Sequence, residues 1–512
     1  MGCEIISDTL DLEMESLEAI LPDPSKPETI GQGFPFPMLR RSGQVRQMSL
    51  RTITLRNDFV EAVFCVDLGG RFLSLRDIQN GFEALPSGLT LVDDSKRGVT
   101  LNGGLELLLN GTRLGAMAAV DFATHEDESA ELVMFELGHG SGLAWTLRAE
   151  LEPDSVGINC SLSLQNRGGA RQEVKVGWRG LGDRVGVISD SPLAPLTSAG
   201  GIVGLEPHQV ISFSFGLVPL TFPALACNGR GAVGLTDGAA HLQVFGEAPA
   251  AKLVVQTEKG PLEAQVELTA NKPEKIDLSS ISGEIKGLAL FSQGEPLIQW
   301  PAVPTKEYEE EAGTRHFAHW QRALDAIRNK DFVKADHHLE TSLLYNGDDP
   351  MAWWLKAVVQ RHLGVDGERP ELLNAHFLSP LDPALRAESF LTQNEHVKEP
   401  SPLIVPLARD PDSLTEVVCL LIDCHLIEDA TRLIDEGLRH GEHRMLRYLM
   451  AYLHLQHSNM EFEAATHVKA AEAIPIGPPY PWRATEREAL KLLHERFPNL
   501  PHLAHFAALA DS

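Results

Sequence analysis

Apolar and polar positions alternate along the first three hundred residues of the chain. Runs at 49–55, 147–151 and 156–164 place an apolar side chain at nearly every second position. Asn, Asp and Gly residues separate such runs, as at Gln79-Asn80-Gly81. A period of two is typical of antiparallel strands. Because no helical stretches lie between the runs, the pattern predicts a large antiparallel β-sandwich rather than alternating strands and helices.

Helical periodicity replaces this alternation after about residue 313. Over 313–360 the apolar spacing predicts three helices separated by turns. One of these helices is expected to begin at Asp349-Pro350, because an aspartate before a proline is a common helix start. The fold class predicted for the whole chain is therefore multi-domain, β and then α.

The helical half contains an irregular repeat. The segment 331–335, with weaker copies at 426–438 and 445–475, resembles tetratricopeptide repeats, which are helix pairs of about 34 residues. Proline and aspartate interrupt the array between 365 and 412. The domains expected are an N-terminal extension packed partly on the sandwich, the sandwich, a linker and a tetratricopeptide-like domain, at residues 1–44, 45–302, 303–313 and 314–512.

Charge and cysteine content restrict the partners. The 512 residues carry a formal net charge of −27, which argues against binding to nucleic acid or to an anionic membrane. The six cysteines form no CxxC pair, and the histidines form no HExxH motif, so no metal site is expected. The sequence has no glycine-rich phosphate loop and no dinucleotide fingerprint, so no cofactor is expected either. We find no signal peptide and no apolar run long enough to span a membrane, and we expect a cytoplasmic protein.

Two glycine pairs in the first quarter of the chain each precede a charged residue. They are Leu68-Gly69-Gly70-Arg71 and Asn102-Gly103-Gly104-Leu105-Glu106. Glycine permits a positive φ angle or a close backbone approach. Arg71 and Glu106 are therefore expected to point at something other than solvent.

These motifs carry a resemblance to a known fold family. The stretch 55–85 resembles the opening hairpin of galactose mutarotase-like domains. Together with Gly103-Gly104-Leu105-Glu106, it is similar to a family of bacterial domains of this fold that are fused to tetratricopeptide repeats. The resemblance covers roughly residues 45–300. It implies a β-supersandwich with a sugar or glycoside as its ligand.

The candidate site residues follow from sugar chemistry at an anomeric carbon, which needs a proton donor and a base or nucleophile. Glu106 is the first candidate, with Asp183 and His139 as catalytic partners. The candidates for substrate binding are Arg71, Asn102, Trp178 and Arg179. Each has a structural alternative: Glu106 in a salt bridge, Arg71 clamping a turn, and Trp178 packed in the core.

Two functions remain open. One is a carbohydrate-active enzyme, a glycoside hydrolase first and an aldose epimerase-like isomerase second. The other is a sugar-binding or scaffolding protein whose helical repeats associate with another protein or with a second copy. The retained Gly-Gly-Leu-Glu favours the enzyme. Leu107-Leu108-Leu109-Asn110 stands where the family has an aromatic residue followed by an Asn and a Gly-His pair, which favours the binding protein.

Overall fold

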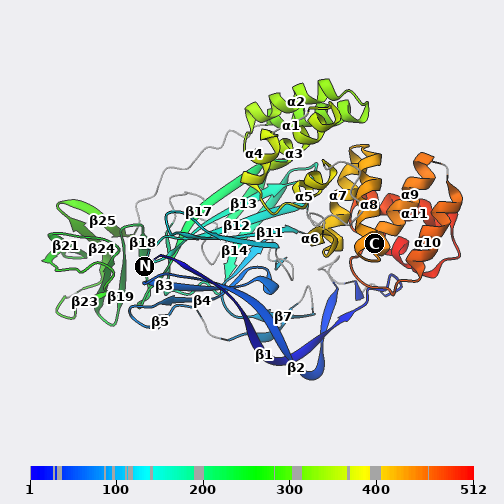
Figure 1. The fold of residues 1–512 in the computed structure, drawn as a ribbon. Helices are drawn as coiled ribbons and strands as arrows, with labels where there is room; N and C mark the ends of the chain where they lie inside the picture. Colours follow the sequence, from blue (N-terminus) through cyan, green and yellow to red (C-terminus); the bar gives the residue numbers. More distant parts are fainter. Residues whose placement is uncertain are drawn as a thin grey trace.

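A computed structural model shows β structure up to Trp300 and helices from Thr314 onward, which confirms the predicted order of fold classes (Figure 1). The structure describes residues 2–26, 29–30, 37–85, 88–94, 98–109, 112–113, 119–138, 142–188, 201–281, 283–301, 314–365, 369–392, 405–458 and 460–511. The residues expected as a linker, 303–313, lie outside this set.

One layer of the large sandwich is built from two antiparallel sheets. The first has the order β1 (Glu4–Ile20), β2 (Met38–Arg56), β3 (Val60–Cys65), β4 (Arg71–Asp77) and β5 (Phe82–Glu83). The second has the order β16 (Gly201–Leu205), β14 (Gln172–Arg179), β8 (Glu106–Leu109) and β9 (Thr112–Arg113). Phe72 and Leu105 exchange backbone hydrogen bonds of 3.0 and 2.8 Å, which joins the two sheets.

A six-stranded antiparallel sheet forms the opposite layer. Its order is β10 (Ala119–Thr124), β11 (Ala130–Gly138), β12 (Leu143–Leu151), β13 (Ile158–Asn166), β17 (Val210–Pro219) and β15 (Val185–Ile188). The alternation of β13 buries Ile158, Cys160, Leu162 and Leu164 in the core between the layers. The polar residues between them, Ser161, Ser163 and Gln165, therefore face the opposite side of the sheet.

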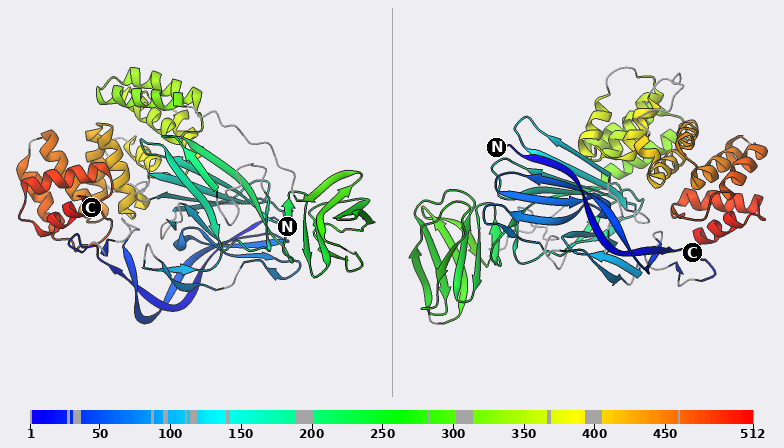
Figure 2. Two further views of the ribbon diagram at one scale, coloured as in Figure 1. Left: turned by 180° about the vertical axis from the view of Figure 1, so that it is seen from behind. Right: turned by 60° about the horizontal axis from the view of Figure 1, so that its bottom comes forward.

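The strands after residue 225 have an apolar core of their own, which includes Val233, Leu242, Leu253 and Leu290. One sheet contains β18 (Ala226–Asn228), β19 (Gly231–Thr236), β20 (Ala239–Val244) and β23 (Glu274–Asp277). The other contains β22 (Gly260–Gln265), β21 (Ala251–Thr257), β24 (Ile285–Ser292) and β25 (Glu295–Trp300). This small β unit lies at the end of the large sandwich away from the last helices (Figure 2).

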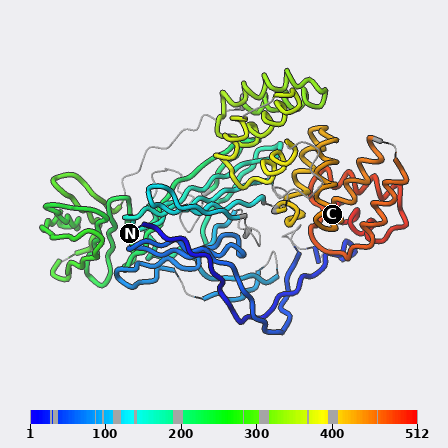
Figure 3. The backbone as a smooth tube through the Cα atoms, viewed as in Figure 1, coloured from blue at the N-terminus to red at the C-terminus, as the bar shows by residue number. Residues whose placement is uncertain are grey.

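The first two strands extend beyond the sandwich as a long hairpin. They are paired from Glu4↔Arg56 to Ile20↔Met38, with a register shift near Glu15. A short hairpin of β6 (Thr90–Asp94) and β7 (Gly98–Asn102) lies against β2, where Arg41 donates to the Leu91 carbonyl. Beyond the tip, Ile30 packs against the apolar core of the helices. The backbone trace shows this hairpin reaching toward the C-terminal helices (Figure 3).

The helical half consists of antiparallel pairs, as the repeat pattern predicts. Its helices are α1 (Thr314–Arg328), α2 (Phe332–Tyr345), α3 (Pro350–His362), α4 (Pro370–Leu378), α5 (Pro383–Leu391), α6 (Val405–Ala408), α7 (Pro411–Asp423), α8 (Ile427–His440), α9 (Arg444–Leu453), α10 (Glu461–Glu472), α11 (Ala484–Arg496) and α12 (Pro501–Asp511). The side chains of Asp331 and Asp349 cap α2 and α3, and Pro350 begins α3. The cap on α3 confirms the predicted helix start at Asp349-Pro350.

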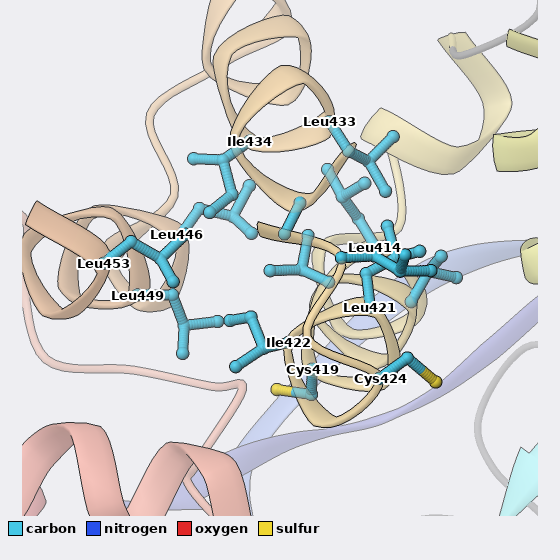
Figure 4. Close-up of a cluster of buried hydrophobic side chains, with 14 of the residues drawn as sticks. Leu414, Cys419, Leu421, Ile422, Cys424, Leu433, Ile434, Leu446, Leu449 and Leu453 are labelled. Atoms are coloured by element: carbon cyan, nitrogen blue, oxygen red, sulfur yellow. The ribbon is translucent and has the colours of Figure 1, made fainter. Parts of the chain in front are cut away.

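Leucine and isoleucine side chains fill the space between neighbouring helices. Leu414, Leu421 and Ile422 of α7 meet Leu433 and Ile434 of α8 and Leu446, Leu449 and Leu453 of α9 (Figure 4). Gly437 allows α8 to approach α7 closely, since a Cβ atom at this position would lie 2.5 Å from the Leu414 side chain. Burial of this apolar surface stabilises the array.

Candidate functional site

Both glycine pairs make turns that no other residue would fit well. Gly69, Gly70, Gly103 and Gly104 have φ angles of 67°, 71°, 127° and 66°. A Cβ atom on Gly104 would lie 2.2 Å from the carbonyl oxygen of Phe72. Positive φ and close backbone approach, the two roles inferred for glycine from the sequence, are both present.

Arg71 and Glu106 point at each other. Arg71 Nη2 lies 2.8 Å from Glu106 Oε1, and the two side chains are only 2% and 8% exposed. Arg71 Nη1 also donates to the carbonyl oxygens of Leu101 and Gly103, at 3.2 and 3.3 Å. The Arg71 guanidinium thus connects the turn at Gly69-Gly70 to the turn at Gly103-Gly104 by hydrogen bonds and neutralises the Glu106 carboxylate.

Two other predicted residues lie close to this buried pair. Arg179 on β14 is in register with Glu106 on β8, so both side chains lie on the same face of the sheet. Asn102 is half-buried at the end of β7, next to Leu101, whose carbonyl accepts from Arg71. The structure therefore brings together Arg71, Glu106, Arg179 and Asn102.

The remaining predicted residues are placed elsewhere. Trp178 follows the alternation to the opposite face of β14, where it is 5% exposed and meets Phe72 and Phe215 edge-to-face. Asp183 is exposed in the segment between β14 and β15. His139 lies outside the residues that the structure describes.

A cavity of about 500 Å³ lies on the outer face of the six-stranded sheet. Its floor consists of outward-facing residues of β11, β12, β13 and β17. Its roof comes from residues 348 and 350 at the start of α3 and residues 377–379 at the end of α4. We call this space the sheet–helix cavity. Its volume suits a small organic ligand.

A row of hydroxyl groups crosses the floor of this cavity. Phe135, Thr146, Ser163 and Ser212 are direct cross-strand neighbours on four successive strands, from β11 to β17. Neighbouring strands are ~4.8 Å apart, so the three hydroxyls are spaced evenly along the row. Each hydroxyl can both donate and accept a hydrogen bond. The row can therefore bind several hydroxyl groups of one ligand.

An ion pair lines the cavity beside this row. Arg148 Nη1 donates to Glu131 Oε1 at 2.9 Å, and Arg148 Nη2 donates to the backbone carbonyl of Phe377 at 2.8 Å. Arg148 thus links the sheet to the end of α4. Because its charge is balanced by Glu131, it contributes directed N–H groups more than net positive charge.

Buried polar contacts flank the cavity on its helical side. Gln165 Nε2 donates to Asp349 Oδ1 at 2.9 Å, and Arg167 forms an ion pair with Asp382. Burial raises the pKa of Asp349 to about 7, although the caps to Met351 and Ala352 and the charge of Arg167 act in the opposite direction. Further along the junction, the His208 ring stacks on Phe317 of α1 and lies tilted against Trp320, with ring centroids 4.3 Å apart. Burial lowers the pKa of His208 to about 3.

The cavity residues were not predicted from the sequence, although the alternation places them on one face of the strand. The alternation at 156–164 correctly separates Ser161 and Ser163 from the apolar face. A polar strand face is typically solvated, and nothing in the pattern indicates that helices almost two hundred residues later cover it. The informative feature was the small size of these polar residues, which leaves room above the sheet.

Neither a membrane helix nor a metal site is found within the described ranges. No helix there has both the length and the apolarity that a bilayer crossing requires. Among the same residues, no group of three or more His, Cys, Asp or Glu side chains is arranged to hold a metal ion.

Comparison with known proteins gives weak structural neighbours. A TPR-domain containing protein from Parabacteroides distasonis is 12% identical, with a TM-score of 0.30 over 93% of this chain and 97% of that chain. A polysaccharide lyase is 11% identical, with a TM-score of 0.14 over 81% of each chain. No protein-family model and no curated protein matches the sequence.

Proposed function

We propose that this protein binds a small neutral carbohydrate in the sheet–helix cavity. The observation that carries the proposal is the row of Thr146, Ser163 and Ser212 hydroxyls beside Phe135 on the cavity floor. Sugars present several hydroxyl groups around an apolar ring. The row of hydroxyls complements the sugar hydroxyls, and Phe135 at the end of the row adds apolar surface to the floor.

The charge of the cavity favours a neutral ligand. Arg148 is paired with Glu131, and Asp348 on the helical side adds a carboxylate rather than a cation. An anionic ligand would therefore meet no uncompensated positive group among these lining residues. The resemblance of residues 55–85 and 103–106 to galactose mutarotase-like domains supports a sugar among the neutral ligands.

Binding is proposed ahead of glycoside hydrolysis because of the position of Glu106. Its carboxylate is paired with Arg71, and its neighbours Leu105 and Leu107 point into the sandwich core. Glu106 therefore faces away from this core, while the cavity lies on the outer side of the opposite layer. A ligand bound in the cavity would be out of reach of this carboxylate.

Isothermal titration tests the proposal with galactose, glucose, xylose, N-acetylglucosamine, lactose and cellobiose. We expect at least one of these sugars to bind, and Ser163→Val to weaken that binding about tenfold, because one hydrogen bond is lost and its partner is left unpaired. The matched control is Ser7→Val on β1, an exposed strand position outside the cavity. Absence of binding by all six sugars, or equal affinity of the Ser163→Val variant, would contradict the proposal.

A screen of nitrophenyl glycosides separates binding from hydrolysis. The native chain and Glu106→Gln are compared after both are shown to be folded. We expect no turnover by either protein. Turnover by the native chain that is lost in Glu106→Gln, with folding intact, would establish hydrolysis at Glu106 instead.

A further inference from the structure

The two walls of the sheet–helix cavity come from parts of the chain with large cores of their own, which meet in a small apolar cluster where Leu381 packs with Phe135 and Ala144 of the floor. The floor belongs to the large sandwich and the roof to helices α3 and α4. The volume and shape of the site therefore depend on how firmly the helices are docked on the sheet.

One buried ion pair spans this junction. Arg167, directly after β13, pairs with Asp382, and their side chains are 7% and 0% exposed. We call this pair the Arg167–Asp382 latch. Asp382 also caps α5 by accepting from the Ala384 amide at 2.9 Å. The latch thus connects the end of a floor strand to the start of a helix that follows the roof residues.

The latch is tied to the cavity from the sheet side. The Arg167 guanidinium lies over the Phe135 ring, 5.7 Å from its centroid, and its Nε donates to Gln165 Oε1 at 3.3 Å. Gln165 in turn donates to Asp349, between the roof residues Asp348 and Pro350. The contacts of Arg167 therefore orient the floor residues Phe135 and Gln165 and, through Gln165, the start of α3. Neither Arg167 nor Asp382 lines the cavity itself.

We infer that Arg167 and Asp382 are positioning residues whose ion pair holds the cavity in its binding-competent form, so that carbohydrate binding and helix docking stabilise each other. This inference rests on the proposed function. A ligand that contacts both walls binds the docked arrangement and not the separated one. The apparent dissociation constant of the ligand is therefore inversely proportional to the fraction of molecules in which the helices are docked on the sheet. By the same linkage, bound ligand increases the docked fraction.

Asp382→Asn tests the latch with little other change. Asparagine retains the helix cap but loses the charge that pairs with Arg167. The matched control is Asp410→Asn, because Asp410 caps α7 in the same way, also before a proline, and makes its side-chain bonds within that helix. Arg167→Gln provides a second variant that removes the opposite charge. Circular dichroism establishes folding of each variant.

Hydrogen exchange of α5 and β13 amides measures docking, and titration with the sugars named above measures binding. We expect Asp382→Asn and Arg167→Gln to speed exchange at both elements and to raise the dissociation constant about tenfold. Saturating sugar should return exchange in these variants to the native rate, a response that a purely structural ion pair would not give. Asp410→Asn should change neither measurement.

The failures of the two proposals are distinguishable. If the native chain binds none of the sugars, the proposed function is wrong and this inference falls with it. If the native chain binds a sugar but the latch variants keep native exchange, or bind it with native affinity despite faster exchange, the inference alone is overturned. Faster exchange that sugar does not reverse also overturns it.

Discussion

Replacing Glu106 with glutamine tests how much the buried Arg71–Glu106 ion pair stabilises the junction of the two glycine turns. The change keeps the size and shape of the side chain but leaves the Arg71 guanidinium, 2% exposed, without its counter-ion. Removing one partner of a buried ion pair costs about 3 kcal/mol or more, because the remaining charge is still desolvated. We therefore expect a large local effect on stability.

The effect is expected where the two glycine turns meet. Phe72 and Leu105 exchange two backbone hydrogen bonds immediately beside Arg71 and Glu106. Their amides report opening of this junction when exchange follows the opening equilibrium. A loss of about 3 kcal/mol corresponds to exchange faster by about a hundredfold. Amide exchange measured by NMR or mass spectrometry gives this ratio directly.

A surface pair on neighbouring strands supplies the control. Arg56 Nη1 lies 3.6 Å from Glu61 Oε2, and the two side chains are 45% and 23% exposed. Glu61→Gln should therefore lower the free energy of unfolding by less than about 1 kcal/mol. Arg71→Met completes a double-mutant cycle, in which the double variant should lose less than the sum of the two single losses. Equal exchange in Glu106→Gln and Glu61→Gln would refute our account of the buried pair.

Three further results are expected. Gly104→Ala should destabilise the protein by several kcal/mol in thermal unfolding, whereas Gly81→Ala, at a similar φ of 63° but with no atom within 4 Å of its Cβ, should cost only about 1 kcal/mol; equal losses would contradict the steric argument. Because burial raises the pKa of Asp349 to about 7, the folded state retains a proton that the unfolded chain releases. Stability from this group should therefore fall as pH rises from about 4 to about 7, and Asp349→Asn, measured by Tm across that range, should reduce the fall; an unchanged pH profile would refute the assignment. Trp178→Leu should lower Tm without changing sugar affinity, since Trp178 packs between Phe72 and Phe215 in the core; weaker sugar binding at unchanged stability would show that it contacts ligand.

Local patterns in the sequence predicted the elements well because their causes are local. The alternation at 156–164 gives β13, and the aspartates at 331 and 349 begin α2 and α3 by accepting from amides two or three residues later. Both the alternation and the helix caps depend only on residues that are close in the chain. The turns at the glycine pairs are also locally determined, since tolerance of a positive φ angle is a property of glycine itself.

The site was harder to predict because its parts come from distant segments. The sequence indicated that Arg71 and Glu106 would avoid solvent but left open what each would meet, and the structure shows that they meet each other. The cavity depends on helices near residues 350 and 378 covering serines near 162. Alternation assigns a residue to one face of a strand, but it carries no information on what covers that face.

The hairpin of β1 and β2 also affects the order in which tertiary contacts can form as the protein folds. Ile30, beyond its tip, packs against the helical core. Burial lowers the pKa of His505 on α12, and Asp23 lies close enough to oppose this shift. During synthesis the hairpin emerges well before the helices that it contacts. Such distant contacts slow folding because a very long segment must close first. The hairpin therefore gains its full set of contacts only after the helices, several hundred residues later in the chain, have been synthesised.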